Sequence, residues 1–106
     1  MKTSDKRSDI MQAALDLIAE QGFHRTPMAE IAAKAGVAAG TIYRYFESKD
    51  LLINELHREL EGKIMMVLQE SYPSGRPLRE RFLYLLRELI RYFITNPHHF
   101  RYMEQY

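Results

Sequence analysis

Residues 27–46 read PMAEIAAKAGVAAGTIYRYF, and this stretch decides the fold. It has the spacing of two short helices joined by a tight turn. Ala32 is small enough for the helices to cross there, and Gly36 allows a sharp turn four positions later. Ile42, six positions further on, would anchor the second helix to the core. The spacing therefore predicts a helix-turn-helix.

The two helices have recognisable ends. We expect the first to cover Pro27–Ala35, with Thr26 as its N-cap, because a Thr hydroxyl can accept hydrogen bonds from free amides and Pro loses nothing at the first helical position. We expect the second to cover Ala39–Phe46. The positions predicted to be buried are Ile31, Ala35, Val37 and Tyr45. The positions predicted to face outward are Ala38, Ala39, Gly40, Thr41, Tyr43 and Arg44.

Helical periodicity continues on both sides of this unit. Upstream, apolar residues at helical spacing predict a helix over Ser8–Gln21, which Gly22 would end. Downstream, Ser48 is expected to cap a helix that reaches Glu70. Within that helix, Gly62 is consistent either with a bend or with close packing against a neighbour.

The second half of the chain is also helical in pattern. Ser71–Pro77 concentrates turn-forming residues, and Leu78–Ile94 then keeps the helical period until Pro97 ends it. A further apolar pattern begins in His98–Tyr106 and stops without a cap. No segment alternates with a period of two, so we expect an all-α protein.

Composition excludes several classes of protein. A chain of 106 residues is too short for a multidomain enzyme, and 46% hydrophobic residues are too many for a disordered protein. The absence of cysteine excludes disulfides and suits a reducing compartment, so we expect a cytoplasmic protein. We expect neither a membrane span nor a signal peptide, because the apolar runs are short. The net charge is only +1, so any nucleic-acid binding would depend on a local patch.

The outward face of the second helix carries groups that can read DNA. Arg44 can make a bidentate contact with guanine, and Thr41 can contact a base edge or a thymine methyl group. The small residues at the start of the helix permit close approach of the backbone. Other side chains suit phosphate oxygens, which position a protein without reading sequence. These side chains are Thr26, Tyr43 and Lys49.

The sequence GVAAGTIYRYFESKDLL at residues 36–52 resembles the signature of TetR/AcrR-type transcriptional regulators, and the resemblance extends over residues 6–66. It implies that Ala39–Phe46 is a DNA recognition helix. This chain departs from the family at Ala38, where a helix-capping Ser is common, and at Ala29, where a basic or polar residue is common. The positions that the resemblance implies to contact DNA are Thr26, Ala39, Gly40, Thr41, Tyr43, Arg44, Tyr45 and Lys49.

The resemblance also implies a domain organisation: an N-terminal tail at 1–5, a DNA-binding domain at 6–66, and at 67–106 the truncated start of an effector-binding and dimerisation domain. It implies a homodimer on a palindromic DNA operator, acting as a repressor and released when a small-molecule effector shifts the helix that ends at Glu70. No cofactor is implied. By analogy, the candidate effector-pocket residues are Phe82, Leu86 and Phe93.

Two other classes of function are weaker alternatives. The chain could be a helical protein-interaction module with an incidental helix-turn-helix. A metal-dependent or enzymatic role finds little support, because the pairs His57 with Glu61 and His98 with His99 have no evident third ligand. We also find no glycine-rich phosphate loop and no nucleophile with a base beside it. We therefore expect no metal site and no enzymatic activity.

Overall fold

The computed structural model describes residues 5–105, and these form six helices and no strand. The predicted all-α class is therefore confirmed. None of the helices in this range is long and apolar enough to cross a membrane. The helices are α1 (Lys6–Gln21), α2 (Met28–Ala35), α3 (Ala39–Tyr45), α4 (Lys49–Glu70), α5 (Leu78–Thr95) and α6 (Pro97–Gln105).

Helix α1 begins two residues earlier than the periodicity predicts, and it ends where predicted. The side chain of Asp5 caps it by accepting hydrogen bonds from the backbone amides of Arg7, at 3.1 Å, and Ser8, at 3.4 Å. At the other end Gly22 has a φ of 91°, and its amide donates to the carbonyl oxygen of Ile18 at 2.9 Å. The acidic cap, which the apolar pattern does not include, explains the earlier start.

The predicted cap of α2 is wrong. Pro27 is the N-cap and the helix begins at Met28, with no side-chain cap hydrogen bond. The Thr26 side chain is buried, and its hydroxyl donates to the carbonyl oxygen of Gly22 at 2.7 Å instead of accepting from the amides of α2. The Thr26 hydroxyl therefore does not cap α2, because it is hydrogen-bonded to Gly22 in the preceding loop.

The turn between α2 and α3 forms as predicted. Gly36 has a φ of 77°, in the left-handed region, and its amide donates to the carbonyl oxygen of Ala33 at 3.2 Å. The amide of Val37 donates to the carbonyl oxygen of Ala32 at 3.0 Å, which completes the Gly-ended turn. Helix α3 then starts after Ala38, whose side chain makes no cap hydrogen bond.

Helix α4 is continuous over 22 residues. The Ser48 hydroxyl oxygen caps it by accepting from the amide of Leu51 at 3.2 Å, as predicted. A Cβ atom built on Gly62 would meet nothing within 4 Å, so close packing does not explain that glycine. The proposed domain boundary at residues 66/67 falls inside this helix.

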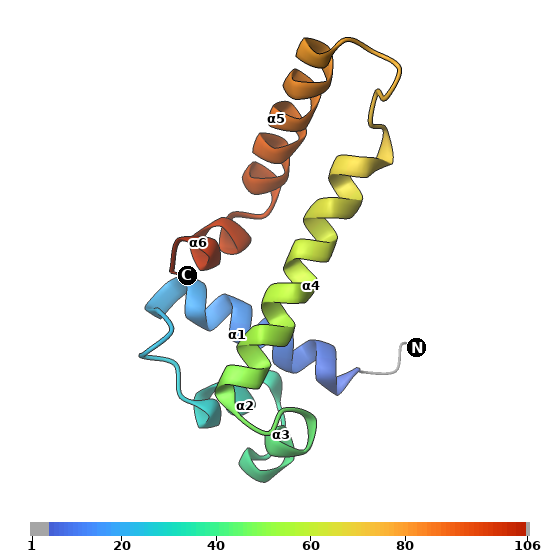
Figure 1. Ribbon diagram of the computed structural model, residues 1–106. Coiled ribbons are helices and arrows are strands. Elements are labelled where there is room, and N and C mark those ends of the chain that lie inside the picture. Colours follow the sequence, from blue (N-terminus) through green and yellow to red (C-terminus); the bar gives the residue numbers. More distant parts are fainter. Residues whose placement is uncertain (1–4, 106) are drawn as a thin grey trace.

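Helix α1 lies at the centre of the core. Helix α2 packs against one side of it, α6 lies against its C-terminal half, and α4 crosses it, while α5 returns alongside α4 (Figure 1). Tyr102 of α6 belongs to the same buried cluster as the helix-turn-helix residues, so the end of the chain packs onto the first helix. The most buried members of the cluster are Ile10, Ala14, Ile18, Ile31, Ala32, Ile42, Leu52 and Tyr102.

Candidate nucleic-acid interface

Helix α3 presents one anchored side and one exposed side. Ile42 is completely buried and Phe46, just after the helix, is almost so, and together they fix α3 to the core. On the outer side Tyr43 is 50% exposed and Arg44 is also exposed. Thr41 is half-buried. The other outward positions that lie on the exposed side are Ala38, Ala39 and Gly40.

Tyr45 was predicted to be buried, and this is wrong. Its side chain is 42% exposed, because Phe46, one position later, fills the core at the end of α3. Tyr45 therefore joins Tyr43 and Arg44 on the accessible surface. Two phenol hydroxyls and one guanidinium are hydrogen-bond donors of the kinds that bind phosphates and base edges.

Lys49 has a partner within the molecule. Its Nζ donates to the backbone carbonyl oxygen of Phe23 and lies 4.3 Å from the centre of the Phe23 ring. Loss of water around Nζ lowers the pKa of Lys49, and the neighbouring Asp50 carboxylate partly opposes this shift. The side chain therefore joins the start of α4 to the loop between α1 and α2.

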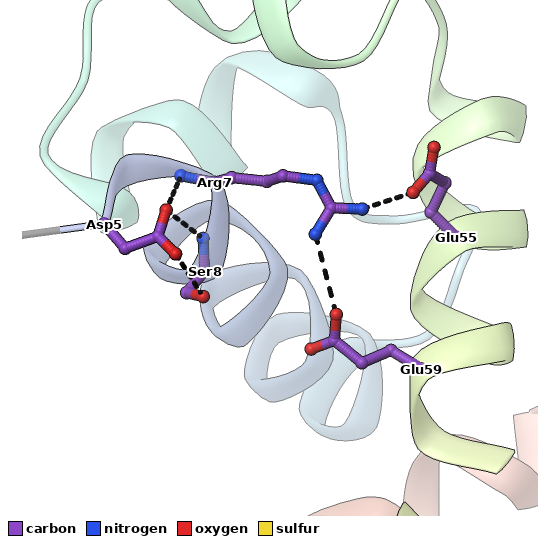
Figure 2. A network of polar contacts seen from close by, with 5 residues as sticks. All are labelled: Asp5, Arg7, Ser8, Glu55 and Glu59. Atoms are coloured by element: carbon purple, nitrogen blue, oxygen red, sulfur yellow. Dashed lines mark hydrogen bonds and ion pairs between the residues drawn. The ribbon is translucent and has the colours of Figure 1, made fainter. Parts of the chain in front are cut away.

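A polar network that the sequence did not predict holds α1 against α4 (Figure 2). Arg7 forms an ion pair with Glu55, and its Nη1 lies 3.6 Å from Glu59 Oε2. The Arg7 guanidinium also lies 5.5 Å from the centre of the Phe46 ring. Glu55 and Glu59 are four residues apart on one face of α4. This spacing indicates that the two carboxylates could share a cationic partner, but it does not indicate which residue that partner is.

The three predicted effector-pocket residues of α5 differ in their surroundings. Phe82 is 60% exposed, and Leu86 lines a shallow cavity of about 330 Å³ that includes neither Phe82 nor Phe93. Phe93 packs instead against α6, with its ring centre 5.3 Å from that of Phe100 and 5.7 Å from that of His99. The outer face of α5 remains largely apolar and exposed.

Two of the three histidines weighed as metal ligands lie beside carboxylates. His57 Nε2 lies 3.5 Å from Glu61 Oε2, and His98 Nδ1 lies 3.0 Å from Asp16 Oδ1. Between residues 5 and 105, no group of three His, Cys, Asp or Glu side chains is placed to hold a metal ion. The contact of His98 with Asp16 joins α6 to α1 across 82 positions of sequence.

Comparison with known proteins gives consistent matches. A family model described as "Bacterial regulatory proteins, tetR family" matches residues 10–56. The chain is 36% identical over 76 residues to the Fatty acid metabolism regulator protein of Bacillus subtilis (strain 168), an alignment that covers 72% of this chain and 39% of that protein. It is 35% identical over 94 residues to the HTH-type transcriptional repressor KstR of Rhodococcus jostii (strain RHA1). That alignment covers 88% of this chain and 43% of KstR.

The fold is similar to solved structures over nearly the whole chain. A TetR-family transcriptional regulator from Haemophilus influenzae Rd superimposes with a TM-score of 0.85 at 28% identity, covering 95% of this chain and 56% of that one. The chain thus spans about half the length, or less, of the relatives it matches. The residues matched by the family model include the helix-turn-helix and the first turns of α4.

Proposed function

Because the chain belongs to the TetR family of bacterial regulatory proteins, we propose that it is the DNA-binding part of a sequence-specific transcriptional regulator, most simply a repressor released by a small-molecule effector. The observation that carries this proposal is the presentation of α3. Ile42 and Phe46 anchor the helix from behind, and its other side offers Tyr43, Arg44 and Tyr45 to a partner. This is the arrangement by which a recognition helix enters a major groove.

The residues have different proposed roles in that groove. Arg44 and Thr41 read base edges, while Tyr43 and Tyr45 bind phosphate oxygens. Small residues at the start of α3, Ala39 and Gly40, allow the backbone close to the DNA. Thr26 and Lys49 act through the loop that joins α1 to α2, because both side chains bond to carbonyl oxygens of that loop.

The remaining helices are proposed to begin a regulatory domain. The outer face of α5 exposes large apolar side chains, and a contiguous face of this kind is normally covered in a folded protein. Residues 67–106 would then be the first part of an effector-binding and dimerisation domain, with Phe82, Leu86 and Phe93 beside the effector. The regulator would act in the cytoplasm as a homodimer on a palindromic operator, without a cofactor or enzymatic activity.

The test is selection of duplexes from a random pool, followed by NMR titration of the chain with the selected duplex and a scrambled one at two salt concentrations. We expect shifts centred on α3 and binding that weakens as salt rises. Arg44→Ala should reduce the preference for the selected duplex by roughly tenfold or more. Arg79→Ala, which removes an exposed cation from α5, should leave that preference intact.

Two results would contradict the proposal: shifts that avoid α3, or binding that does not respond to salt. A protein-interaction module with an incidental helix-turn-helix would select no duplex from the pool. That alternative is not favoured, because the relatives that match the chain carry the names of transcriptional regulators and repressors.

A further inference from the structure

The side-chain amide of Gln21 connects three parts of the candidate DNA-binding unit. Gln21 is the last residue of α1, and its side chain is half-buried. Its Nε2 lies 2.8 Å from the carbonyl oxygen of Arg25 in the following loop and 2.9 Å from Glu30 Oε1 in the first turn of α2. It also lies 3.4 Å from the hydroxyl oxygen of Thr26. One side chain therefore joins α1, the loop and α2.

The two nearest partners fix the orientation of this amide group. A backbone carbonyl oxygen and an ionised carboxylate only accept hydrogen bonds, so the atom that faces Arg25 and Glu30 must be a donor. The amide nitrogen carries two hydrogens, and these two acceptors use both of them. A carboxylate at position 21 would have the same shape, but it would place an oxygen against two acceptors.

The loop that Gln21 contacts is also held from two other directions. The Thr26 hydroxyl donates to the carbonyl oxygen of Gly22 at 2.7 Å. Lys49 Nζ, from the start of α4, donates to the carbonyl oxygen of Phe23. Together with the contact made by Gln21, side chains from α1, α4 and the loop itself thus bind three carbonyl oxygens of the loop. These contacts fix where α2 begins relative to α1.

The contact with Glu30 continues this restraint into α2 and engages a negative charge. In a helix-turn-helix the first helix crosses the phosphate backbone of bound DNA. Glu30 is an exposed residue in the first turn of that helix, and a free carboxylate there would repel phosphates. The hydrogen bond from Gln21 holds the carboxylate at the end of α1.

We propose that Gln21 is a positioning residue for DNA binding, an inference that rests on the proposed function of the chain. Gln21 acts through the backbone of Arg25 and the carboxylate of Glu30, not by contact with DNA. It fixes the start of α2, and hence the direction in which the α2–turn–α3 unit presents α3. It also prevents the Glu30 carboxylate from turning toward the phosphates.

The experiment compares two variants of equal charge and shape in the titration with the selected duplex. Gln21→Glu replaces the amide donor with a carboxylate, and Gln12→Glu makes the same change elsewhere on α1. Gln12 is the matched control because its Nε2 also donates to a carboxylate, Asp16 Oδ1 at 3.0 Å, but this bond lies within α1. We expect Gln21→Glu to bind the duplex roughly tenfold more weakly than Gln12→Glu. Affinities are measured at a temperature at which circular dichroism shows each variant to be folded.

Exchange of the two partners provides a second test. Glu30→Gln, added to Gln21→Glu, removes the contact between two carboxylates and restores a donor, now at position 30. It should raise the affinity of the Gln21→Glu variant severalfold more than it raises that of the Gln12→Glu variant. Gln21→Ala, which removes the donor without adding a charge, should also weaken binding severalfold, whereas Gln12→Ala should not.

The proposal on Gln21 is overturned if Gln21→Glu and Gln12→Glu bind the duplex equally well, or if Glu30→Gln raises the affinity of both variants by the same factor. Either result leaves the proposed function intact, provided that the unaltered chain prefers the selected duplex to the scrambled one. If the unaltered chain shows no such preference, both proposals fail.

Discussion

The Nζ of Lys49 donates to the backbone carbonyl oxygen of Phe23 and lies over the ring of the same residue. The first residue of α4 is therefore bonded to the loop that separates α1 from α2. In the recognition unit, which consists of α2, the turn and α3, this contact fixes the position of α2 relative to α4. It therefore also fixes the direction in which α3 points. Lys49, whose side-chain chemistry suits phosphate contact, thus has an internal partner.

The role of Lys49 can be tested with Lys49→Met, which keeps the aliphatic stem and removes the charge. We expect a loss of about 1 kcal/mol in the free energy of unfolding, measured by urea denaturation, because a partly buried charged hydrogen bond is lost. DNA affinity should fall for all sequences alike. Unchanged stability with a smaller dependence of affinity on salt would show that Lys49 binds a phosphate directly. Lys34→Met, on the exposed side of α2, is the matched control.

The turn glycine and the helix glycine should respond in opposite directions to the same substitution. Gly36→Ala should destabilise the chain by about 1 kcal/mol, because a side chain is unfavourable at the left-handed φ of 77°. Gly40→Ala should stabilise it by about 0.5 kcal/mol, because Gly40 lies in α3 and a Cβ there meets nothing within 4 Å. If the backbone of α3 approaches DNA, Gly40→Ala should nevertheless weaken DNA binding. Thermal unfolding and DNA titration of both variants separate these effects.

The start of α3 lacks a side-chain cap, and Ala38→Ser should supply one. The backbone of Ala38, with φ of −68° and ψ of 151°, already has the extended conformation of an N-cap residue. We expect a gain of about 1 kcal/mol in the free energy of unfolding. Ser48→Ala is the reciprocal variant, since Ser48 already caps α4, and it should lose a similar amount. Equal stability of Ala38→Ser and the unaltered chain would contradict the prediction.

The Arg7 network should contribute modestly to stability. Arg7 and its two carboxylate partners are each about 40% exposed, so we expect Arg7→Met to cost about 1 kcal/mol, including the contact with the Phe46 ring. High salt should reduce the difference in the free energy of unfolding between Arg7→Met and the unaltered chain. Arg76→Met breaks an exposed pair with Glu80 on the far side of the molecule, and it should cost only a few tenths of a kcal/mol.

The buried His99 should make stability depend on pH. Its pKa in the folded chain is lowered from 6.5, so below that value the unfolded chain takes up a proton that the folded chain does not. Stability should therefore decrease as the pH falls from 6.5 through the folded pKa, and His99 should have no effect above 6.5. Urea denaturation from pH 8 to pH 5 measures this slope. His99→Phe should reduce the slope.

The local parts of the fold follow from local signals. Gly22 and Gly36 end helices where predicted. Glycine adopts a positive φ without a steric penalty, and this property of the residue does not depend on contacts with distant parts of the chain. Ser48 caps α4 for the same reason. The α2–turn–α3 unit was therefore predictable almost to the residue.

The errors have a common physical origin in contacts with other elements. The Thr26 hydroxyl bonds to Gly22, a partner that helix-capping statistics do not consider. Tyr45 is exposed because Phe46 occupies the core position beside it. The packing of α6 on α1 joins His98 to Asp16 across 82 positions, and no local pattern indicates such a pair. Side-chain direction at the candidate interface was thus less predictable than the helices that carry it.

Because α4 is continuous, a movement at one of its ends can be transmitted to the other end. At 1.5 Å per residue, its 22 residues span about 33 Å. Its first turn is fixed to the recognition unit through Lys49 and Leu52, and its far end lies beside α5. A tilt of about 5° about the first turn displaces the far end by roughly 3 Å over this length. A small movement of the far end of α4 relative to α5 therefore tilts α4. This tilt changes the angle at which α3 is held, near the first turn of α4.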